Sequence, residues 1–158
     1  MKLLRSRWPA VSVLAAAVVL FLLTCRAETQ DVSLNPLYGS ANLKAGFLPD
    51  PYKVKVVAGG PIQTKLGGVT AWVAKAPDFR LNYRAGSAAL TFYVEAPQDT
   101  TLLINDPDGK WFADDDGNGN LNPKIRFANP KSGQYDIWIG SFNRDQNPNA
   151  VLYITELR

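Results

Sequence analysis

The stretch from Phe79 to Glu95 reads FRLNYRAGSAALTFYVE, and apolar side chains occupy every second position in both of its halves. These positions are Phe79, Leu81 and Tyr83, followed by Leu90, Phe92 and Val94. Successive side chains of a β-strand point to opposite faces of a sheet. A period of two therefore predicts two strands, each with one face in a core and the other toward water.

The same period recurs along the chain, which predicts about eight strands in total. The other segments that carry it are 54–56, 102–104, 125–127, 135–139 and 150–157, and the adjacent aromatic residues Trp111 and Phe112 predict one more short strand. Asp106-Pro107-Asp108-Gly109 predicts a tight turn, and the glycines at 59–60 and 67–68 predict a loop that crosses from one sheet to the other. No helical period occurs after residue 27. The expected fold is all-β, an antiparallel β-sandwich or jelly roll.

The first 27 residues are predicted to be a secretory signal peptide. Three basic residues precede an apolar run over 11–23 that is too short to span a bilayer comfortably, and Cys25-Arg26-Ala27 offers a cleavage site after Ala27. Alternatively, residues 22–25 resemble a lipobox, in which case Cys25 would carry a lipid anchor. We expect a secreted or periplasmic protein with a polar arm over 28–45 and one β-sandwich domain over 46–158.

The net charge of +3 does not indicate a nucleic-acid partner. Four of the 17 basic residues (Lys2, Arg5, Arg7 and Arg26) lie in the predicted leader, so cleavage leaves 13 against 14 acidic residues. A protein that binds nucleic acid needs a basic surface that survives processing.

The residue types that are missing argue against most enzyme classes. The chain has no histidine, and Cys25, its one cysteine, falls in the predicted leader. Catalytic triads, thiol chemistry and the common zinc sites are therefore excluded from the mature chain. A hydrolase that uses Asp114 and Asp116 is the remaining enzymatic alternative. Carboxylates crowded on a glycine-rich loop favour a cation over an acid/base pair, so we expect a protein that is not an enzyme.

Residues 105–122, NDPDGKWFADDDGNGNLN, predict a calcium-binding loop. From Asp114 the order is D-x-D-x-N-G, which matches the first six positions of a calcium loop. Ile125 stands where an EF-hand would have a bidentate glutamate, so the expected site is a calcium loop between strands. Its predicted ligands are Asp114, Asp116, Asn118, Asn120 and Asn122. The alternative is a solvated turn without a metal.

Two tryptophans, Trp111 and Trp138, are candidates for a ligand-facing aromatic surface. A flat aromatic ring on a sheet face is suited to hold a sugar ring or a peptide. Packing in the core is the alternative for both side chains.

Residues 99–157 resemble the bacterial pre-peptidase C-terminal domain, a small β-jelly-roll appendage of secreted peptidases. The resemblance rests on the segments DTTLLINDPDG (99–109), DDDGNG (114–119), IRF (125–127), SGQYDIWI (132–139) and LYIT (152–155). It implies a non-catalytic accessory role, sometimes with calcium, in the secretion or stability of a peptidase or in its attachment to substrate. The expected partner is a secreted peptidase, a peptide or, from the candidate aromatic surface, a glycan. A carbohydrate-binding module and a peptidase inhibitor or secretion helper are the alternative functions.

Overall fold

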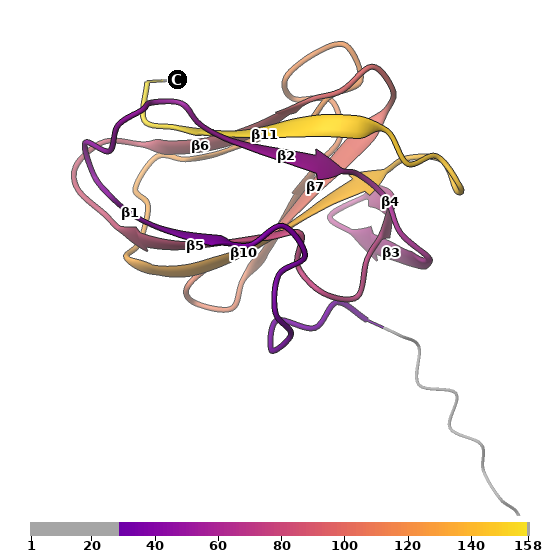
Figure 1. Ribbon diagram of the computed structural model, residues 1–158, viewed down its shortest axis with the longest axis horizontal. Coiled ribbons are helices and arrows are strands. Elements are labelled where there is room, and N and C mark those ends of the chain that lie inside the picture. Colours follow the sequence, from indigo (N-terminus) through magenta and orange to yellow (C-terminus); the bar gives the residue numbers. More distant parts are fainter. Residues whose placement is uncertain (1–28, 158) are drawn as a thin grey trace, which may run out of the picture.

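The computed structural model describes residues 29–157, which form two β-sheets packed face to face (Figure 1). The predicted signal peptide and Cys25 lie outside the described residues. The strands are β1 (Ser40–Lys44), β2 (Tyr52–Val57), β3 (Ile62–Leu66), β4 (Val69–Val73), β5 (Phe79–Arg84), β6 (Leu90–Glu95), β7 (Thr100–Asn105), β8 (Trp111–Asp114), β9 (Lys124–Phe127), β10 (Gly133–Ser141) and β11 (Asn149–Thr155). The prediction of an all-β sandwich is confirmed.

The nine-residue strand β10 organises the larger sheet. One of its edges pairs with β5 and then with β4, which gives the order β1-β5-β10-β4-β3, while its other edge pairs with β7, followed by β8. The smaller sheet has the order β2-β11-β6-β9. The pairing of β1 with β5 is parallel, unlike the antiparallel ladders around it. Within residues 29–157 no helix is long and apolar enough to cross a membrane.

The core lies between the two sheets and follows the period of two that the sequence shows. On β5 the residues Phe79, Leu81 and Tyr83 are buried, and on β6 Leu90, Phe92 and Val94 are fully buried. β10 contributes Tyr135, Ile137 and Ile139 to the same core, and β11 contributes Leu152 and Ile154. Burial of these side chains, at roughly 25 cal/mol per Å² of apolar surface, is the main driving force for this fold.

Residues 62–73 form a β-hairpin, so the prediction of a loop over the whole glycine-rich region was wrong. Gly59 and Gly60 do lie where the chain passes from β2 in one sheet to β3 in the other. Gly67 and Gly68 instead form the two-residue turn of the β3–β4 hairpin, with φ values of 58° and 93°. Two successive positive φ values suit the tight hairpin turn that matches the twist of paired strands.

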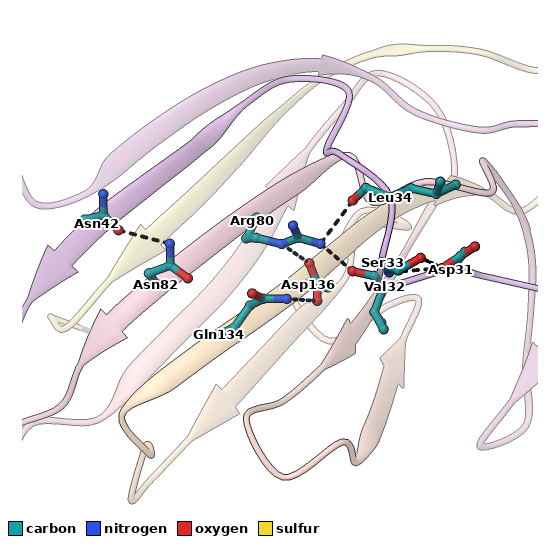
Figure 2. Close-up of polar contacts among 9 residues, drawn as sticks. All are labelled: Asp31, Val32, Ser33, Leu34, Asn42, Arg80, Asn82, Gln134 and Asp136. Carbon is teal, nitrogen blue, oxygen red and sulfur yellow. Dashed lines mark hydrogen bonds and ion pairs between the residues drawn. The ribbon is translucent and has the colours of Figure 1, made fainter.

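The N-terminal arm is part of the sandwich. Its strand β1 pairs with β5, and Arg80 on β5 holds the residues before β1 (Figure 2). Arg80 Nη2 donates hydrogen bonds to the carbonyl oxygens of Val32 at 2.6 Å and Leu34 at 3.1 Å. Arg80 Nε also donates to Asp136 Oδ1 at 2.6 Å. Residues 40–44 of this arm therefore belong to the larger sheet as its strand β1.

The carboxyl group of Asp78 lies inside the sandwich, just before β5. Only 1% of Asp78 is exposed, and its Oδ2 accepts a hydrogen bond from Ile139 N–H at 2.7 Å. Burial raises the pKa of Asp78 to about 8, although the hydrogen bond from Ile139 acts in the opposite direction. The Asp78 carboxyl is therefore mainly protonated in the folded protein at neutral pH.

This buried carboxyl predicts a stability that falls with rising pH. The unfolded chain releases the proton of Asp78 near the ordinary aspartate pKa of about 3.9, whereas the folded chain releases it near pH 8. Between these values the folded state binds more protons, so the free energy of unfolding decreases as the pH rises. Urea denaturation at a series of pH values should show this decrease, and Asp78→Asn should make the profile flatter. Asp145→Asn, at a side chain that is 88% exposed, should leave the profile unchanged. Equal slopes for Asp78→Asn and the parent would contradict the assignment.

Candidate functional site

The side-chain amide of Asn122 joins the connection between β8 and β9 (residues 115–123), which we name the acidic loop, to the turn between β6 and β7. Its Oδ1 accepts hydrogen bonds from Ala96 N–H and from Thr100 Oγ1, both at 3.0 Å. Its Nδ2 donates to the carbonyl oxygens of Ala96 at 3.2 Å and Asn120 at 3.0 Å. Asn122 is 6% exposed, so these bonds are shielded from water. Because Ala96 and Thr100 flank residues 97–99, Asn122 fixes that turn against the loop.

Backbone hydrogen bonds reinforce this junction. Thr100 N–H donates to Leu121 O, and Val94 N–H donates to Pro123 O, both at 3.1 Å. The three residues 119–121 have positive φ values of 80°, 55° and 59°, which curve the loop back toward the turn. The first of them is glycine and the second asparagine, the residue types that adopt this conformation most readily.

Asp114 closes the acidic loop on itself. Its Oδ2 accepts hydrogen bonds from Gly117 N–H at 2.7 Å and from Lys124 N–H at 2.8 Å. A Cβ atom at Gly117 would lie 2.6 Å from the same oxygen, so a larger residue here would displace the Asp114 carboxylate from this position. One carboxylate oxygen of Asp114 is therefore used to shape the loop.

The turn between β6 and β7 places Asp99 beside the acidic loop. The Asp99 Oδ1 atom is buried and makes no hydrogen bond within the described part of the chain. Burial raises the pKa of Asp99, and the negative charges of Asp116 and Asp115 raise it further. We name Asp99, Asp115 and Asp116 the Asp99 cluster. All three side chains are acidic, so their negative charges repel one another.

The structure separates the predicted calcium ligands into two groups. Asp114 and Asn122 use their side-chain oxygens to accept hydrogen bonds that hold the shape of the loop. Asn118 Nδ2 donates to Val94 O at 3.2 Å. Asp116 and Asn120 are exposed, and Asp116 belongs to the Asp99 cluster. Over residues 29–157 no three Asp, Glu, His or Cys side chains are arranged so that they could hold a metal ion directly.

Asp106 has the turn role that the sequence predicts. Gly109 N–H donates to Asp106 O at 2.9 Å, and Gly109 has a φ of 75°. The Asp106 Oδ1 atom accepts hydrogen bonds from Asp108 N–H and Lys110 N–H, both at 2.9 Å. The Asp106 carboxylate therefore stabilises the turn between β7 and β8 by accepting two of its backbone hydrogen bonds.

Trp138 does not face a ligand, because it is fully buried. Its strand neighbours Ile137 and Ile139 point into the main core, so the Trp138 side chain lies on the opposite face of β10. The β3–β4 hairpin, however, covers that side of the sheet and forms a second, smaller core around Trp138 with Ala71, Val73 and Leu103. Trp111 is half-buried over this second core, with its ring centroid 5.1 Å from that of Trp138.

Asp99 and Asp115 are the site residues that the sequence analysis did not identify as ligands, and of the two only Asp99 lies outside the predicted loop. The sequence places Pro97, Gln98 and Asp99 between two predicted strands, which is a turn like several others in the chain. The position of Asp99 near residues 115–116 depends on the long-range hydrogen bonds of Asn122. No local sequence pattern predicts these bonds.

In comparisons with known proteins, no family model matches this chain and no curated sequence matches it significantly.

The hydrogen bonds of Asn122 predict a large loss of stability in Asn122→Ala. The substitution leaves the Ala96 N–H, the Ala96 carbonyl and the Thr100 hydroxyl without their partner. Because each unsatisfied buried group costs about 1–3 kcal/mol, we expect the free energy of unfolding to fall by at least ~2 kcal/mol in urea denaturation. The exposed Asn129→Ala is the control and should change stability by less than about 0.5 kcal/mol. Similar stabilities for the two variants would show that Asn122 does not hold the loop.

Proposed function

We propose that this protein is an exported, non-catalytic β-sandwich module that binds a partner and that calcium stabilises its acidic loop. The observation that carries the calcium proposal is the buried Asp99 Oδ1 atom, which has no hydrogen-bond partner within the described residues. The Asp99 carboxyl also feels the like charges of Asp115 and Asp116. A divalent cation would give this oxygen a partner and would neutralise the repulsion within the Asp99 cluster.

Calcium prefers six to eight oxygen ligands in a flexible arrangement. At the Asp99 cluster the ligands would be Asp99, Asp115 and Asp116, with backbone carbonyl and water oxygens in the remaining positions. Asp115 and Asp116 would have to turn their side chains toward Asp99, because the three carboxylates are not arranged around one point. Asp114 and Asn122 would support the loop from behind.

The accessory role rests on the chemistry that the sequence offers. Without histidine and without a thiol in the predicted mature chain, the usual nucleophiles and general bases are missing. The hydrolase alternative needs Asp114 as an acid or base, and one oxygen of Asp114 already accepts two backbone hydrogen bonds. The resemblance to the pre-peptidase C-terminal domain favours a secreted peptidase or its substrate as the partner. A carbohydrate-binding role would rest on Trp111, since Trp138 is buried.

The calcium proposal predicts a rise in thermal stability with calcium concentration. A ligand that binds only the folded state stabilises it by about 2.7 kcal/mol at a concentration 100 times its Kd. We expect calorimetric titration with CaCl2 to give binding heat and the melting temperature to rise in parallel. Asp99→Asn and Asp116→Asn should each weaken binding, because each removes a charged ligand.

Asp145→Asn is the matched control, since it removes the same charge from a side chain that is 88% exposed on another loop. It should bind calcium like the parent. The absence of both heat and stabilisation at millimolar calcium would refute the calcium site. A response that is lost equally in Asp145→Asn would show that calcium acts only through the overall charge.

A further inference from the structure

The outer face of the smaller sheet carries a strong excess of positive charge. Side chains alternate along each strand, and the exposed, outward positions of β2 and β9 include the four cations Lys53, Lys55, Lys124 and Arg126. Among the outward positions of β2, β11, β6 and β9, Glu95 is the one acidic residue. We name this surface the basic face. Its charge is +3, four cations and one carboxylate, whereas the predicted mature chain has 13 basic and 14 acidic residues.

The strand register places one pair of cations at each edge of the basic face. Lys53 lies opposite Tyr153, Tyr153 opposite Tyr93, and Tyr93 opposite Lys124. Three strand spacings therefore separate Lys53 from Lys124, which is about 14 Å between their backbones. Figure 1 shows β2, β11 and β6 side by side in one layer. The two cation pairs thus flank the sheet on its two edge strands.

Two stacked tyrosines fill the row between the cation pairs. The ring centroids of Tyr93 and Tyr153 are 4.6 Å apart with an interplanar angle of 6°, and Lys53 Nζ lies 5.0 Å from the Tyr153 centroid. The Glu95 carboxylate accepts a hydrogen bond from the Tyr153 hydroxyl. In the described part of the chain no carboxylate lies within ion-pair distance of the ammonium groups of Lys53, Lys55 and Lys124. These charges are therefore available to an anion from outside.

The character of the basic face favours a water-soluble polyanion over a lipid surface. Binding to a bilayer surface scales with buried apolar area as well as with charge. Val57, at the end of β2, is the one exposed large apolar side chain among these outward positions. An open and flat face also lets the hydroxyl groups of a sugar keep their water, so that charge can drive the binding.

We propose that the basic face binds an acidic polysaccharide, whose carboxylate or sulfate groups pair with the cations at both edges of the sheet. The choice of a polysaccharide over a nucleic acid rests on the proposed export of the protein. The basic face includes none of the proposed calcium ligands, so the interaction does not require calcium.

Surface plasmon resonance of the mature chain on immobilised polygalacturonate and heparin, with a calcium chelator present, tests this proposal. Methyl-esterified polygalacturonate is the matched probe, because it keeps the sugar chain and lacks the charges. We expect the protein to bind the two acidic polysaccharides and not the ester. The affinity should fall at least about tenfold between about 50 and about 200 mM NaCl, because each ionic contact releases counterions.

Two double variants test the location. Lys53→Gln with Lys124→Gln removes one cation from each edge of the basic face and should weaken binding at least about tenfold at low salt. Lys65→Gln with Lys75→Gln removes the same charge from exposed positions outside this face and should bind like the parent. All four side chains are exposed, so thermal unfolding should show that both variants remain folded.

Unchanged binding in the Lys53 and Lys124 variant would overturn the proposal, as would an equal loss in both double variants. Binding to neither acidic polysaccharide would also overturn it, and so would tighter binding to phosphatidylglycerol vesicles or to single-stranded DNA. Because calcium is absent, a failure here leaves the calcium titration as a separate test of the acidic loop.

Discussion

The hydrogen bonds of the Asn122 side chain are the constraint on which the acidic end of this molecule depends. They hold together two segments that carry like charge, the turn with Asp99 and the loop with Asp115 and Asp116. Two unit charges 4 Å apart repel by about 1 kcal/mol in water, and more near a protein surface. The three hydrogen bonds of Asn122 to Ala96 and Thr100 contribute about 0.5–1.5 kcal/mol each, and the backbone bonds around them add to this. The junction can therefore keep three carboxylates close together.

The topology explains why this junction forms. The turn between β6 and β7 passes from the smaller sheet to the larger one, and the acidic loop between β8 and β9 passes back. Because β6 pairs with β9 and β7 pairs with β8, both crossings lie at the same end of the sandwich. The loop is thus anchored by strands of both sheets, and a cation bound there would connect the two layers.

The fold was largely predictable from local pattern, whereas the site was not. The alternation in residues 79–95 identifies the side chains that face the core, and the structure confirms it for β5. On β6 the predicted core residues are buried, but Thr91 and Tyr93 on the other face are buried too, so the expected water-facing side was wrong there. The β3–β4 hairpin was missed because Gly67-Gly68 resembles a loop as much as a turn. Without the hairpin, the sequence left open whether Trp138 faces a ligand or packs in a core. The D-x-D-x-N-G spacing correctly marks a curved loop. It cannot tell whether the oxygens of Asp114 and Asn122 face an ion or backbone amides, and it does not include Asp99, which approaches through long-range contacts.

The most direct test of the central claim, that the Asp99 cluster gathers a cation, is the pKa of Asp99 measured from its carboxyl carbon by NMR with and without calcium. Without calcium, burial and the charges of Asp116 and Asp115 should keep this pKa above the ordinary aspartate value. Saturating calcium should lower it, because the bound ion favours the ionised carboxylate. An Asp99 carboxyl that titrates at the same pH under both conditions would contradict the account.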